Sequence, residues 1–142
     1  MPLMRERLDE RWPVGRRSSR RSRMSGIHLL TVSAAGGIGA VARYGAEELF
    51  VRRRPRARDV ATALVNVTGC FAVGVVASHG HGWLGPHLDL ATTGLLGGYT
   101  TFSGAIALPY LNWRAGQRAR SVTVVVATAL ASALAFAVGL ST

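Results

Sequence analysis

Four long stretches without Asp, Glu or Arg are the feature that most limits how this chain can fold. The chain has no Lys, and the stretches cover residues 24–42, 60–78, 90–111 and 121–142, which are 19, 19, 22 and 22 residues long. A helix of roughly 20 apolar residues crosses the roughly 30 Å hydrocarbon core of a bilayer. The pattern therefore predicts an all-α membrane protein with four transmembrane helices.

The segments outside these stretches are short or strongly basic. The connections at 52–59, 79–89 and 114–120 are too short to hold a soluble domain. Residues 1–23 contain eight arginines and three acids, and such a composition buries too little apolar surface to fold. We expect a disordered arginine-rich arm at 1–23 that contacts anionic lipid headgroups rather than nucleic acid, followed by one transmembrane domain at 24–142.

The distribution of arginines bears on orientation. With four spans, the arm and the 79–89 connection lie on one side of the bilayer and together carry eight arginines. The 52–59 and 114–120 connections lie on the other side and carry five and three arginines, which is also eight. Orientation follows the side with more Arg, and here neither side has more. A chain without a preferred orientation can insert both ways, which suggests an antiparallel dual-topology dimer.

The third stretch combines glycines with hydroxyl side chains at 94–104, where the sequence reads GLLGGYTTFSG. Glycine is costly in a helix interior, and Ser and Thr compete for backbone hydrogen bonds. A pair of glycines alone is typical of a close helix crossing, as are Gly36 and Gly39 in the first stretch. The added Thr-Thr-Phe-Ser run favours a third helix broken mid-membrane, where irregular backbone must be buried in protein or line a cavity.

Other polar residues allow both a structural and a functional interpretation. Asn66, in the second stretch, is either an interhelical hydrogen bond or an N–H donor to an anion. Arg43 either reaches the interface, pairs with Glu47 or attracts anions at a vestibule. The histidines at 79, 81 and 87 are interpreted as a solvated loop rather than a metal site. No arrangement of side chains supports catalysis, so we expect no enzyme.

Residues 36–44, 62–69 and 94–103 together resemble the three motifs of the Fluc/CrcB family of fluoride ion channels, in order and spacing. The resemblance covers about residues 26 to 141. It implies a multi-pass protein of the cell membrane that exports fluoride passively and reduces fluoride toxicity in the cytoplasm. It also implies an antiparallel dimer with two narrow pores and a central structural sodium ion, formed with a second copy or with a paired family member.

The resemblance assigns roles to individual residues. Asn66 matches the pore asparagine and Phe102 matches the first of two pore phenylalanines. Arg43 matches the first-span arginine, which we place at the vestibule. The backbone carbonyls that hold sodium correspond to Gly97 and Thr100. Two hydroxyl residues are expected either to line the fluoride path or to satisfy the broken helix, namely Thr101 and Ser103.

The chain also departs from the family pattern. Ala105 and Leu108 stand in the region where the family has its second phenylalanine and a polar tail. In the last stretch, Val124 and Thr128 loosely correspond to a Tyr and a Ser that line the exit. An alternative is therefore a degenerate structural subunit of a heterodimeric fluoride channel. A small drug exporter is less favoured, because it needs a membrane carboxylate and only Glu47 and Glu48 are available.

Overall fold

The computed structural model describes residues 26–55 and 57–142, with the side chains at 81 and 83 left out; the arm expected at 1–23 lies outside these residues. The described part is helical and contains no strand. Its elements, in chain order, are α2 (Gly26–Arg53), α3 (Arg58–Trp83), the 3-10 turn η1 (Gly85–His87), the π-helix η2 (Leu90–Leu96), α4 (Gly97–Tyr99), α5 (Phe102–Arg114) and α6 (Arg118–Ser141).

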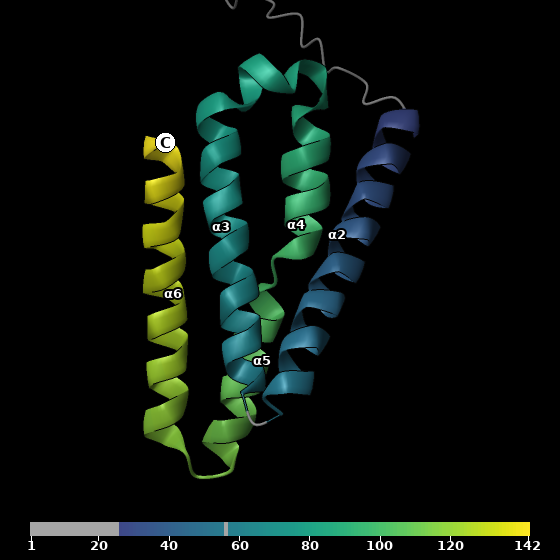
Figure 1. The fold of residues 1–142 in the computed structure, drawn as a ribbon. Helices are drawn as coiled ribbons and strands as arrows, with labels where there is room; N and C mark the ends of the chain where they lie inside the picture. The colour runs from purple at the N-terminus through teal and green to yellow at the C-terminus, as the bar shows by residue number, and fades with distance from the viewer. Residues whose placement is uncertain (1–25, 56) are drawn as a thin grey trace, which may run out of the picture.

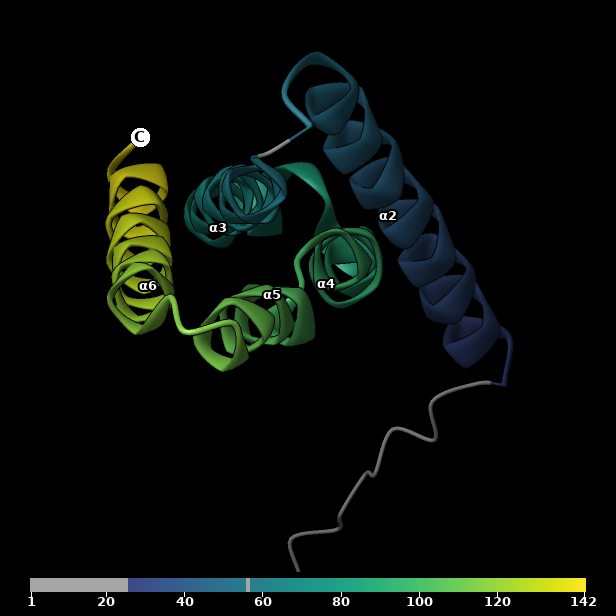
Figure 2. The same cartoon turned by 90° about the horizontal axis from the view of Figure 1, so that it is seen from below.

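The helices run up and down in a bundle (Figure 1). α2 descends, α3 returns, η2, α4 and α5 together descend, and α6 returns to the end that carries the C-terminus. Viewed along the bundle, α3 lies between α6 and the pair formed by α2 and α4 (Figure 2). The described chain thus has the four antiparallel passes that the four uncharged stretches predict.

The second helix is longer than the uncharged stretch that predicts it. α3 continues to Trp83, so residues 79–83 are helical and their assignment to a loop was wrong. Nothing in this segment forbids a helix until Gly85, which has a positive φ of 46° and is followed by Pro86. A positive φ suits glycine and ends the run of helical backbone there.

Two helices in the described residues are long and apolar enough to cross a membrane, at Arg58–Gly80 and Arg118–Ser141. Interruption of the third stretch divides it into shorter elements, and α2 includes charged residues in its second half. The surface is nevertheless apolar along the bundle, with Ile27, Leu30 and Leu134 each about 70% exposed, at 73%, 72% and 67%. Such a surface is typical of a membrane protein rather than of a domain surrounded by water.

Glycines allow the closest helix crossing. A Cβ added to Gly39 of α2 would meet the Leu95 carbonyl, and a Cβ added to Gly98 would meet the Gly36 carbonyl. The prediction that Gly36 and Gly39 admit another helix is therefore confirmed. A second crossing joins α3 to α6 through Gly74 and Gly139. Close backbone approach of this kind is how helices associate in lipid.

Candidate functional site

The site is built around two residues of extended backbone. α4 ends at Tyr99, Thr100 has φ −78° and ψ 155°, Thr101 has φ −145° and ψ 116°, and α5 begins at Phe102. Thr100 closes the preceding helical turn, because its backbone N–H and its hydroxyl both donate to the Leu96 carbonyl at 3.0 Å. Within the third pass, the chain therefore leaves helical geometry only between Tyr99 and Phe102.

Asn66 of α3 supplies the hydrogen bonds that this extended segment lacks. Its Nδ2 donates to the Thr101 carbonyl at 3.0 Å, and the Thr101 N–H donates to Asn66 Oδ1 at 2.8 Å. The side chain is buried, with 7% of the residue exposed. An amide is the neutral group that can both donate and accept in this way, which explains the residue type at this position.

The same contact frees an acceptor at the end of α4. In a continuous helix the Thr101 N–H would donate to the carbonyl four residues earlier, that of Gly97. Here that N–H is directed to Asn66 instead. The Gly97 carbonyl consequently loses its usual helical partner at the end of α4, where helix carbonyls carry partial negative charge.

Thr101 caps the start of α5, and Ser103 contacts the capping hydroxyl. The Thr101 hydroxyl accepts from the Gly104 N–H at 3.1 Å, which is an N-cap, and lies 3.1 Å from the Ser103 hydroxyl. N-cap hydroxyls of this kind stabilise a helix start by about 1 kcal/mol. Of the two roles expected for these residues, the structure shows the capping role for Thr101, and a place on the fluoride path stays a prediction for both.

A pocket of about 300 Å³ opens beside the break. Asn66 and Phe102 both line it, so the structure brings together the two residues assigned to the pore. Phe102 is 83% exposed, and Ala105 lies in the same wall. The rest of the lining comes from Cys70, Thr100, Thr101, Ile106, Val125, Thr128, Ala129 and Ser132. The pocket therefore joins an amide, an aromatic ring and hydroxyl groups in a largely apolar setting.

The last helix contributes a hydroxyl pair that the sequence interpretation only partly found. Thr128 lines the pocket as expected, whereas Val124 lies in a separate groove between α3 and α6. The second hydroxyl is that of Ser132, whose Oγ is buried and has no hydrogen-bond partner among the described residues. Its spacing of one helical turn from Thr128 is the signal that would have revealed it.

Arg43 lies outside this pocket. Its Nε is buried and has no hydrogen-bond partner in the part of the chain that the structure describes. Pairing with Glu47, one of the three roles considered, is absent from the ion pairs of the described residues, and Glu47 Oε1 accepts from the Thr62 hydroxyl at 3.1 Å. Thr62 is buried and lies one helical turn before Asn66 on α3, so this contact ties α2 to the helix that carries the amide.

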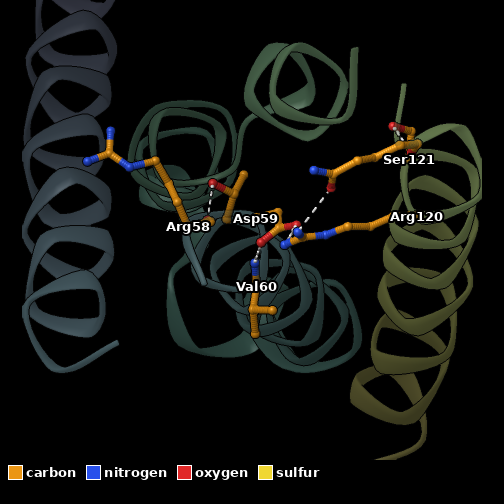
Figure 3. Close-up of polar contacts among 7 residues, drawn as sticks. Arg58, Asp59, Val60, Arg120 and Ser121 are labelled. Carbon is orange, nitrogen blue, oxygen red and sulfur yellow. Dashed lines mark hydrogen bonds and ion pairs between the residues drawn. The ribbon is translucent and has the colours of Figure 1, made fainter. Parts of the chain in front are cut away.

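An ion pair that the sequence interpretation missed fixes one end of the bundle (Figure 3). Arg120 Nη2 at the start of α6 lies 2.8 Å from Asp59 Oδ2 at the start of α3. The Asp59 side chain is 6% exposed, and its other oxygen accepts from the Val60 N–H at 3.2 Å. Gln117 Oε1 accepts a further bond from Arg120, at 3.2 Å. The pair holds the helices on either side of the pocket together.

The histidines do not form a metal centre within the described residues, where no group of three His, Cys, Asp or Glu side chains is placed to hold a metal ion. His79 Nδ1 lies 2.7 Å from the Ser78 hydroxyl, and His28 lies 3.6 Å from Asp89. The His81 side chain lies outside the described residues.

Comparison with known proteins adds an independent finding. Residues 30–140 match the family described as CrcB-like protein, Camphor Resistance (CrcB). The fluoride-specific ion channel FluC of Paracoccus denitrificans is 37% identical over 115 residues, which cover 80% of this chain and 91% of the relative. The corresponding protein of Rhizobium meliloti is 36% identical over 121 residues, 80% of this chain and 94% of the relative.

A further relative, fluoride-specific ion channel FluC 1 of Leifsonia xyli, is 40% identical over 84 residues, which cover 58% of this chain. That match spans 61% of the relative, less than two thirds of its length. No solved structure matches the chain.

Proposed function

The chain belongs to the CrcB family, and on this premise we propose that it is a subunit of a fluoride-specific ion channel in the cell membrane. Fluoride would leave the cytoplasm down its electrochemical gradient, which reduces its toxicity there. The channel names of the relatives from Paracoccus denitrificans and Rhizobium meliloti, matched over nine-tenths of their lengths, support this function. No bond is made or broken in such passage, so the protein is a channel and not an enzyme.

The observation that carries the proposal is the pocket that Asn66 and Phe102 share beside the break. Asn66 Nδ2 has two hydrogens and donates one of them to the Thr101 carbonyl, which leaves a second N–H for an anion. The edge of the Phe102 ring carries the positive part of its quadrupole. Together they offer a strongly hydrated anion partners that replace water without holding it tightly, as conduction requires.

A structural sodium ion fits the carbonyl end of α4. The Gly97 carbonyl lacks its helical partner because the Thr101 N–H donates to Asn66. Thr100 is extended, so the Thr100 carbonyl does not point along a helix toward a helical partner. Carbonyl oxygens at the end of an interrupted membrane helix are suitable ligands for sodium. We assign Gly97 and Thr100 to this site, where the ion would supply positive charge at the negative end of the helix.

The assembled channel is an antiparallel dual-topology dimer of four-span subunits, with the break at membrane depth. The exposure of Phe102, at 83%, supports a second subunit that covers it. The numbered name FluC 1 fits a family in which the second subunit can be a paired member rather than an identical copy. Arg43 would lie at the vestibule, where its charge attracts anions.

One observation favours the alternative of a degenerate structural subunit. Ala105 lines the pocket next to Phe102, so this wall has a methyl group where the family resemblance implies a second ring. In that case the chain completes a heterodimer without conducting on its own.

Fluoride efflux from liposomes that contain only this chain tests the proposal and separates it from the alternative. The proposal predicts efflux of fluoride and retention of chloride. Efflux that requires a second family member would instead support the structural subunit. Absence of fluoride efflux both alone and with that partner would contradict channel function.

A further inference from the structure

A second groove, about 350 Å³ in volume, lies between α5 and α6 on the half of the bundle that ends in their connecting turn. On α5 it is lined by Ile106, Pro109, Tyr110 and Trp113, which recur every three or four residues and so share one face. Val122 and Val126 line the α6 side. The groove is thus continuous and apolar, and it follows both helices over a length of about 10 Å.

Arginines stand at the end of this groove. Arg114 is the last residue of α5 and Arg118 is the first of α6. The Arg118 guanidinium lies 5.5 Å from the centre of the Trp113 ring, a cation–π contact that holds it above a groove residue. Neither arginine forms an ion pair with any described residue, whereas the neighbouring Arg120 is paired with Asp59.

We propose that this groove binds an acyl chain of an anionic phospholipid, with the headgroup phosphate between Arg114 and Arg118. The proposal goes beyond fluoride conduction and concerns the lipid that surrounds the channel. Trp and Tyr side chains concentrate where a membrane protein meets the headgroups, and Trp113 and Tyr110 are 44% and 56% exposed there. Guanidinium groups bind phosphate through paired hydrogen bonds, which suits a phosphodiester at the mouth of an apolar groove.

Charge complementarity favours lipid over a second copy of the chain. The described residues include four acids, and each already has a polar partner: Glu47 accepts from Thr62, Glu48 pairs with Arg52, Asp59 pairs with Arg120, and Asp89 lies by His28. A second copy would therefore cover the two arginines without offering them a free carboxylate from this part of the chain. An anionic leaflet supplies phosphate at the required depth.

Quenching of Trp113 fluorescence by brominated lipid tests the proposal directly. A full-length variant with Trp12→Phe and Trp83→Phe keeps Trp113 as its single tryptophan and is reconstituted in phosphatidylcholine vesicles. Brominated phosphatidylglycerol should quench Trp113 at a mole fraction about tenfold lower than brominated phosphatidylcholine, because two arginines favour the anionic headgroup. The double substitution Arg114→Gln/Arg118→Gln should abolish this preference.

The matched control is Arg53→Gln/Arg54→Gln, which removes the same charge from the same end of the bundle but away from the groove. It should keep the preference. If the Arg114→Gln/Arg118→Gln protein does not fold, raising the salt concentration on the parent protein should remove the preference instead. Equal quenching by the two lipids would overturn the proposal by showing ordinary lipid contact, and no quenching by either would overturn it by showing that a second copy covers the groove.

Discussion

The Asn66 side chain and the Thr101 backbone form a reciprocal pair of hydrogen bonds, at 3.0 Å and 2.8 Å, across 35 residues of sequence. The amide oxygen therefore replaces the helical acceptor of the Thr101 N–H, and the NH₂ group adds a bond to the carbonyl of the N-cap residue. The same amide lines the pocket with Phe102. One hydrogen of the Asn66 NH₂ group thus bonds the Thr101 carbonyl, and the other is the proposed donor to fluoride.

Replacing Asn66 by Ala should lower stability as well as stop fluoride efflux. The substitution leaves the partly buried Thr101 N–H without an acceptor, and an unpaired buried donor costs about 1–3 kcal/mol. The thermal midpoint of unfolding in detergent should fall well below that of Asn112→Ala, which removes an amide that makes no side-chain hydrogen bond to the other described residues. Equal midpoints would show that the contact contributes nothing to stability.

Gly39→Ala should weaken the packing of α2 on the third pass, because its Cβ would meet the Leu95 carbonyl. Overpacking of this kind costs about 1–3 kcal/mol. The control is Gly45→Ala on the same helix, where a Cβ has nothing within 4 Å. The control should be neutral or slightly stabilising, since alanine has the higher helix propensity. Unfolding midpoints measure both variants, and a Gly39→Ala protein as stable as the control would contradict the crossing.

Arg120→Gln should destabilise the bundle more than Arg52→Gln. Asp59 is 6% exposed and would lose its ionic partner, whereas Glu48 is 37% exposed and its pair with Arg52 lies on a helix surface. We expect a loss of about 1–3 kcal/mol for Arg120→Gln, because it leaves a buried charge without its partner, and less than about 0.5 kcal/mol for Arg52→Gln. Adding Asp59→Asn to Arg120→Gln should recover part of the loss. Additive losses in this double-mutant cycle would argue against a direct interaction.

Ala105→Phe should place a second ring in the wall of the pocket. If the chain conducts alone, fluoride efflux should rise or stay unchanged, because the new ring adds a positive edge beside Phe102. Ala107→Phe is the control, on the exposed side of α5 and outside the pocket lining. A folded Ala105→Phe protein that has lost efflux, beside an active control, would show that the small residue keeps the path open.

The helical fold and the residues around the break could be predicted because both depend on local chemistry. Uncharged stretches mark helices that contact lipid, and the glycine and hydroxyl composition of residues 94–104 indicated irregular backbone where Thr100 and Thr101 are extended. The close approach allowed by Gly36 and Gly39 follows from the absence of a side chain.

Contacts that depend on how distant helices are aligned could not be predicted. Asp59 and Arg120 looked like ordinary ends of helices, and their pairing needs α3 and α6 to start at the same level of the bundle. In the sequence, Ser132 does not differ from the other small residues of α6. It lies in the pocket because of the rotation of α6 about its axis, which depends on helix packing. Arg43 had three possible roles in sequence, and the position of Thr62, which donates to Glu47, could not be known before α2 and α3 were aligned.

Fluoride efflux from liposomes containing Asn66→Asp, compared with Asn112→Asp, tests the central claim most directly. Aspartate keeps an oxygen for the Thr101 N–H but removes both N–H donors, so the break retains an acceptor while the pocket loses its donor to fluoride. The account predicts that folded Asn66→Asp protein releases no fluoride and that Asn112→Asp conducts normally. Fluoride efflux at the unsubstituted rate through Asn66→Asp would contradict it.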